Sequence, residues 1–222
     1  MARAPSFAGV ILAAGESSRM GTDKALLPWP PQDLGRAASQ PPAWVAPKDT
    51  FLSTAIRSLL LAADFVVVVA GKNEAVLAPV AYANGASVAI NPDPARGQFS
   101  SLQVGLREVL DRGRDAAIIT LVDRAPVGAA TVQLLRDAFA FAPQNIWAVV
   151  PEVSGKHGHP YLVGRELIEV FLQATPTASA RDIEHRYQDR IQYVVVNDPF
   201  VALNVNTPED YAALATKSSS KA

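Results

Sequence analysis

Two stretches of this sequence are apolar without interruption, and they constrain its fold more than any other feature. Residues 66–69 are four consecutive valines, and residues 117–119 are Ala-Ile-Ile. A strand with one face in water alternates apolar and polar residues, whereas a strand covered on both faces is apolar throughout. Doubly covered strands are typical of mainly parallel sheets, so we expect an α/β protein.

Amphipathic stretches alternate with strand-like runs along the whole chain, which is the pattern of successive βαβ units. Strands are predicted at residues 7–13, 65–70, 88–90, 116–121, 147–150 and 191–196. Helices are predicted at residues 50–62, 74–83, 100–112, 129–141, 165–172, 180–187 and 208–216. The expected fold is a single domain with a mainly parallel, twisted sheet flanked by helices, in a Rossmann-like arrangement.

Composition excludes several classes of protein. The chain has 222 residues, is 49% hydrophobic and 18% charged, and carries a formal net charge of −1. This balance favours a substantial core and gives no electrostatic footprint for nucleic acid or an anionic membrane. The absence of cysteine excludes disulfides and thiolate chemistry. No apolar segment approaches the roughly 20 residues that span a bilayer, and we interpret the N-terminal apolar run as a buried strand of a cytoplasmic protein.

One domain is expected over residues 1–216, with an irregular insertion at 28–49 and a disordered polar tail at 217–222. The insertion contains six prolines, which exclude a regular helix. Trp29 and Trp44 are the side chains that could attach it to the domain.

The first strand leads into a loop bounded by Gly15 and Gly21 that also contains Arg19 and Lys24. The glycines permit a close backbone approach, and the N–H groups of such a loop can point together at an anion. The two cations suit phosphate oxygens. The spacing matches neither the P-loop nor the dinucleotide fingerprint. From these residues alone, a phosphate cradle and an ordinary turn are equal alternatives.

Oxygen-bearing side chains follow two later segments. Asp123 comes just after the predicted strand 116–121, where ligands of open α/β sheets collect, so it is placed either for Mg²⁺ or for capping a turn. Asn204 and Asn206 lie on one face of the chain before Thr207-Pro208, which is a strong helix start.

Five motifs resemble those of nucleotidyltransferases that activate cofactors and sugars, above all the molybdopterin cytidylyl- and guanylyltransferases. The opening L-A-A-G-x-S-x-R-M-G-x-x-K spans residues 12–24. L-V-D-x-x-P-V at 121–127 resembles the family's metal motif, and N-x-N-T-P-E-D at 204–210 resembles its ending. G-x-x-S-S-L at 97–102 and G-x-x-G-H-P at 155–160 are similar to segments of the cytidylyltransferases.

The resemblance implies a GT-A-type nucleotidyltransferase fold and a Mg²⁺-dependent transfer of a nucleoside monophosphate from an NTP to a phosphorylated acceptor, with release of pyrophosphate. The implied metal ligands are Asp123, Asn206 and, as an additional candidate, Asn204. The implied catalytic residues are Arg19, Lys24 and Asp123. The implied nucleotide-binding residues are Leu12, Ala13, Ala14, Gly15, Ser17, Arg19, Gly21 and Lys24. The implied substrate residues are Gly97, Ser100, Ser101 and His159, although by chemistry alone the serines would be simple helix caps.

The nucleotide and the acceptor follow from finer features of the same resemblance. Ala14, the serine pair at 100–101 and the Gly-His-Pro loop resemble the cytidine enzymes, whereas Asn204-Val205-Asn206 looks more like the guanylyl branch. CTP is therefore favoured. Molybdopterin is the expected acceptor, with a transient contact to a molybdoenzyme or its chaperone. Arg124-Ala125 departs from the family's commonest Gln-Pro and leaves the neighbouring substrate contacts open. The alternatives are a sugar-phosphate or isoprenoid-precursor nucleotidyltransferase, and a non-catalytic nucleotide-binding or cofactor-delivery protein.

Overall fold

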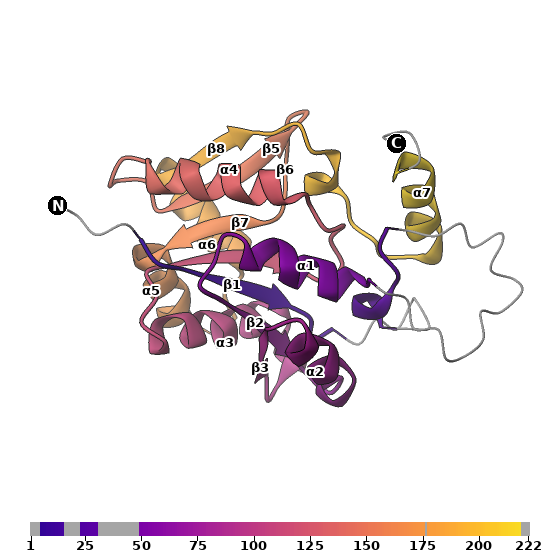
Figure 1. Cartoon of the computed structure of the whole chain (residues 1–222). Helices are drawn as coiled ribbons and strands as arrows, with labels where there is room; N and C mark the ends of the chain where they lie inside the picture. The colour runs from indigo at the N-terminus through magenta and orange to yellow at the C-terminus, as the bar shows by residue number, and fades with distance from the viewer. Residues whose placement is uncertain (1–4, 16–22, 31–48, 176, 219–222) are drawn as a thin grey trace, which may run out of the picture.

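A mixed β-sheet forms the centre of the molecule (Figure 1). The structure, a computed structural model, describes residues 5–15, 23–30, 49–175 and 177–218. Within these residues, eight strands form one sheet in the order β3-β2-β1-β4-β7-β5-β6, with β8 paired to β5. The strands are β1 (Phe7–Leu12), β2 (Phe65–Ala70), β3 (Ser87–Ile90), β4 (Ala116–Leu121), β5 (Ala148–Val153), β6 (Lys156–His157), β7 (Tyr161–Gly164) and β8 (Ile191–Val195).

The pairing confirms the predicted mainly parallel sheet. Strands β1 to β4 are mutually parallel, and β8 runs parallel to β5. Strand β7 is antiparallel to both neighbours, β4 and β5, and β6 is antiparallel to β5. Strands β6 and β7 were not predicted because two and four residues are too few to show a period.

Within the described residues, the chain forms seven α-helices around the sheet. They are α1 (Phe51–Leu60), α2 (Glu74–Ala83), α3 (Gln98–Asp111), α4 (Ala129–Ala140), α5 (Arg165–Gln173), α6 (Ala180–Arg186) and α7 (Pro208–Ser218). All seven were predicted, with ends that differ by at most two residues. Helix α7 continues into the region predicted as a tail, and residues 219–222 lie outside the described residues.

Alternate residues of each central strand enter two separate cores. In β1, Ile11 packs with α1, α2 and α4, whereas Val10 packs with α3, α5 and α6 on the opposite face. The valines of β2 divide in the same way, Val68 into the first core and Val69 into the second. Burial on both faces explains why these strands are apolar throughout and gives a three-layer arrangement (Figure 1).

The predicted insertion leaves and rejoins the domain at one place. The Trp29 N–H donates to the Asp49 carbonyl at 3.0 Å, and Pro28 forms an antiparallel bridge with Thr50. Trp29 packs edge-on against Phe51 at 5.2 Å between ring centroids, which agrees with its expected role. Residues 31–48, with Trp44, lie outside the described residues.

Candidate active site

The site starts where β1 and β4 end side by side. These neighbouring parallel strands pair in register up to Leu12 and Leu121, so the segments that follow leave the same edge of the sheet. Carboxyl ends of parallel strands are where open α/β sheets bind ligands. Leu12, Ala13 and Ala14 are buried there, and Gly15 is exposed. Ser17, Arg19 and Gly21 lie outside the described residues.

Lys24 returns to this edge at the start of a short 3₁₀ helix, η1 (Lys24–Leu26). The Asp23 carboxylate caps η1 by accepting from the Ala25 N–H at 3.0 Å. The Asn73 side-chain amide donates to Asp23 Oδ2 at 2.7 Å and to the Ala13 carbonyl at 2.9 Å. Asn73 therefore ties Lys24's segment to the end of β1, a role that sequence reasoning missed. Its only signal was an Asn two residues after Gly71, at the end of a strand.

The segment before α7 folds back onto the end of β4. Arg124 and Asn204 form an antiparallel bridge, and the Val205 N–H donates to the Asp123 carbonyl at 2.8 Å. This backbone pairing brings Asn206 to Lys24, whose Nζ donates to Asn206 Oδ1 at 3.0 Å. Asn204, the additional candidate, has an exposed side chain.

The start of α7 holds Asn206 in place. The Asp210 carboxylate accepts from the N–H groups of Asn206 and Thr207 at 2.8 and 3.0 Å, and the Thr207 hydroxyl accepts from the Asp210 N–H. The backbone donors lower the pKa of Asp210. The predicted helix start at Thr207-Pro208 is thus confirmed as a reciprocal cap.

Three predicted residues converge at this edge: Lys24, Asp123 and Asn206. Lys24 Nζ lies 3.9 Å from Asp123 Oδ2, with side-chain exposures of 10% and 34%. The other carboxylate oxygen, Asp123 Oδ1, is buried without a hydrogen-bond partner. A buried, unsatisfied carboxylate oxygen is costly unless a cation or donor arrives, so the donor set fits a hard divalent cation.

Such a cation would need oxygens from elsewhere. Among the described residues, no three His, Cys, Asp or Glu side chains group as a metal site. Mg²⁺ commonly takes one or two protein oxygens and completes its shell with substrate phosphates and water. The pair Asp123 and Asn206 therefore suits a metal that arrives with a polyphosphate.

The predicted substrate serines sit behind the loop that carries Gly97. Ser100 and Ser101 are buried, and their hydroxyls accept from the Asn91 amide at 2.8 and 2.9 Å. Ser100 also donates to the Gly97 carbonyl at 2.7 Å. Gly97 has φ +93°, a conformation that favours glycine, and it lines a large cavity. The serines hold the loop, and a substrate contact of theirs stays a prediction.

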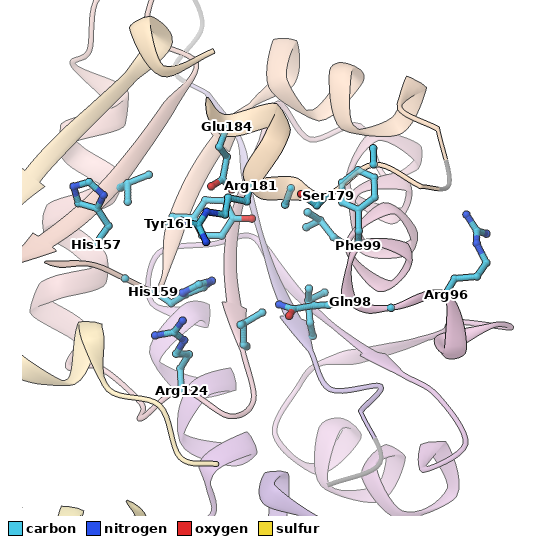
Figure 2. A pocket seen from close by; sticks show the side chains of 18 residues that line it. Arg96, Gln98, Phe99, Arg124, His157, His159, Tyr161, Ser179, Arg181 and Glu184 are labelled. Carbon is cyan, nitrogen blue, oxygen red and sulfur yellow. The ribbon is translucent and has the colours of Figure 1, made fainter. Parts of the chain in front are cut away.

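The cavity has a volume of about 870 Å³ and lies beside the end of β4 (Figure 2). That volume is within the usual range for small-molecule sites. Among the residues that line it are Arg96, Gly97, Gln98 and Phe99 on one side and Arg124, His159, Tyr161, Arg181 and Glu184 on the other.

His159 lies in the cavity wall next to Arg124. Its Nδ1 is buried without a hydrogen-bond partner, and its ring packs edge-on against Tyr161 at 5.2 Å. Burial lowers the His159 pKa to about 3, with Arg124 adding to the effect, so the imidazole is neutral near pH 7. A Cβ at the preceding Gly158 would overlap the Val201 carbonyl, which accepts from the His159 N–H at 3.0 Å. Gly158 thus permits the approach that fixes His159.

Glu184, on α6, is a site residue that sequence reasoning missed. Burial raises its pKa to about 7. Burial, followed by the negative charge of Glu184, raises the pKa of Tyr161 well above its usual value. The only sequence signal nearby was Arg181-Asp182, whose role was left open. Arg181 proves to line the same cavity.

Comparison with known proteins identifies the family. Residues 9–191 match the model of the MobA-like NTP transferase domain. The chain is 26% identical over 205 residues to the molybdenum cofactor cytidylyltransferase of Escherichia coli K12, covering 91% of this chain and 92% of that one. It is 26% identical over 213 residues to a probable molybdenum cofactor guanylyltransferase of Rhodopirellula baltica, covering 93% and 90%.

Solved structures share the fold. The Rv0371c protein of Mycobacterium tuberculosis H37Rv superposes with a TM-score of 0.74 at 24% identity, covering 95% of this chain and 98% of that one. The same mycobacterial protein in complex with manganese gives a TM-score of 0.68 at 20% identity, with the same coverage. The family match spans most of the chain and includes the ends of β1 and β4, so this protein belongs to the MobA-like NTP transferase family and is a nucleotidyltransferase.

Proposed function

We propose that this nucleotidyltransferase uses Mg²⁺ to transfer CMP from CTP to the terminal phosphate of molybdopterin. The observation that carries the proposal is the convergence of Lys24, Asp123 and Asn206 at one sheet edge, with one carboxylate oxygen unsatisfied. The names of the relatives support the acceptor, and the manganese complex of a structural neighbour supports a divalent metal.

In the proposed reaction, an oxygen of the acceptor phosphate attacks the α-phosphorus of CTP. The new P–O bond joins acceptor and CMP through a diphosphate, and the bond from the α-phosphorus to the β-phosphate oxygen breaks. Pyrophosphate keeps that electron pair and leaves. The nucleophile is already anionic, so the chain's residues need to align the groups and neutralise charge rather than remove a proton.

Each residue has a proposed part in this step. Asp123 and Asn206 would hold the metal, which when bound withdraws charge from the phosphate oxygens. Lys24 would contact the triphosphate and the leaving pyrophosphate. Arg19 and the loop from Leu12 would complete that cradle, and Ala14 would favour cytosine.

Pyrophosphate release from each of the four NTPs, with and without molybdopterin, tests the proposal. We expect release from CTP that requires both Mg²⁺ and molybdopterin. Asp123→Asn keeps the shape of the side chain but removes its charge, so release should fall about 100-fold or more. Asp137→Asn, on the exposed face of α4, is the matched control. Equal rates of pyrophosphate release for Asp123→Asn and wild type would refute the metal site. Release from a different NTP in place of CTP would refute CTP as the nucleotide substrate.

A further inference from the structure

The cavity beside β4 is chemically different at its two ends. Arg124 lies at the end nearest β4, and Glu184 lies at the other end, with the rings of His159 and Tyr161 between them (Figure 2). Phe99 and Gln98 face them from the start of α3. The end near β4 therefore carries the Arg124 guanidinium, the other end carries the Glu184 carboxyl with Arg181 beside it, and rings flank the space between them.

The cationic end has unused donors. Arg124 is partly buried, and its Nε is buried without a hydrogen-bond partner. Among the described residues, none accepts a hydrogen bond from its guanidinium, and the buried His159 Nδ1 has no hydrogen-bond partner there either. Because a buried N–H group without a partner is costly, this end suits an anion such as a phosphate, which accepts several hydrogen bonds from arginine.

The end of the cavity that carries Arg124 lies next to the proposed metal site. Arg124 directly follows Asp123, the proposed metal ligand, and its backbone is fixed by the bridge to Asn204. A phosphate bound by Arg124 would therefore lie next to the metal-bound triphosphate. The acceptor must present its nucleophilic oxygen at that point.

The end that carries Glu184 has an unused acceptor. Among the described residues, none donates a hydrogen bond or forms an ion pair with the Glu184 carboxylate, although the side chain is partly buried. A carboxylate in such a place accepts two hydrogen bonds from a ligand that carries adjacent N–H donors. The ring N–H and exocyclic NH₂ of a pterin form such an edge, and its flat ring suits the aromatic walls.

We propose that the cavity binds the acceptor end to end, with its phosphate on Arg124 and the donor edge of a pterin ring on Glu184. The inference rests on the proposed transfer to a phosphorylated pterin and adds the residues that orient it. Arg124 and Glu184 become specificity-determining residues for the two ends of one substrate.

Substitutions at two positions and two ligands test the ends separately. Binding of an unphosphorylated pterin, followed by its fluorescence, reports on the ring end. The KM for molybdopterin in pyrophosphate release with CTP reports on both ends. Glu184→Gln should weaken pterin binding about tenfold or more and raise KM by a similar factor. Arg124→Met should leave pterin binding within about twofold but raise KM about tenfold or more, with partial recovery in Arg124→Lys.

Arg186 is an exposed residue of α6 that does not line the cavity, so Arg186→Gln is the control for a change of charge. Thermal unfolding checks that each variant folds. Unchanged pterin binding in Glu184→Gln, or an unchanged KM in Arg124→Met, overturns the inference. If the wild-type protein still transfers CMP to molybdopterin, the proposed function is unaffected by that result. A wild-type protein that binds pterin but transfers nothing to molybdopterin overturns the proposed function instead. A wild-type protein that does not bind pterin overturns the inference.

Discussion

We expect Glu184 to make the protein less stable as the pH rises, and Glu184→Gln to remove that effect. In the unfolded chain the carboxyl titrates near 4.5, whereas burial raises its folded pKa to about 7. The folded state therefore holds the proton over a range in which the unfolded state has lost it. The contribution of Glu184 to stability therefore falls as the pH rises from about 4.5 to about 7, and this group adds no pH dependence below that range.

The size of the effect follows from that difference. A rise in pKa from 4.5 to about 7, at about 1.4 kcal/mol per pKa unit, sets a ceiling of about 3 kcal/mol above pH 7. The Glu184 side chain is only partly buried, so water screens its charge and we expect about 1–2 kcal/mol. Glutamine has a similar shape and no titration, so it avoids this cost.

Urea unfolding of wild type and Glu184→Gln at pH 5 and pH 8 measures the difference directly. The variant should match the wild type at pH 5 to within about 0.5 kcal/mol and exceed it by about 1–2 kcal/mol at pH 8. Other titrating groups are common to both proteins and cancel in the comparison. A stability difference that is the same at both pH values would refute the reasoning. A variant that is more stable than the wild type only at pH 8 would show that the charged Glu184 carboxylate in the cavity lowers the stability of the folded protein.

Three further substitutions test other parts of the site. Gly158→Ala places a Cβ against the Val201 carbonyl, so we expect a loss of about 1–3 kcal/mol in urea unfolding, and a stability equal to wild type would contradict the close approach. Lys24→Ala removes the cation beside Asp123 and should lower pyrophosphate release about 100-fold or more with a far smaller effect on stability, whereas unchanged turnover would exclude its proposed role. Ala14→Gly should shift the ratio of kcat/KM values from CTP towards GTP, and an unchanged ratio would exclude this position as a selector of the base.

The sequence predicted the fold well because the signals for it are local. Unbroken apolar runs identify strands buried on both faces, and the period of the helices is readable within each helix. Caps are equally local: Thr207 and Asp210 are three residues apart, and their reciprocal bonds form as expected. Strands β6 and β7 escaped because they are too short to carry a period and pair through tertiary contacts.

The candidate site was only partly readable. Lys24, Asp123 and Asn206 stood out through motifs, yet the hydrogen bond between Lys24 and Asn206 joins residues 182 positions apart. Asn73 had only a weak signal near a turn, and Glu184 had only the neighbouring Arg181-Asp182 in its own helix, because the roles of Asn73 and Glu184 come from neighbours that the chain brings in from elsewhere.

The sequence by itself determined the helices and the longer strands, the alternation of strands and helices, and the residue types available at the strand ends. Only the tertiary structure decided which of those ends meet, which oxygen of Asp123 lacks a partner, and that Arg124 and Glu184 occupy opposite ends of one cavity. The physical reason is that periodicity and capping depend on residues a few positions apart. Burial, pKa and contacts across a cavity depend on the order of strands in the sheet, which sets the environment of each side chain.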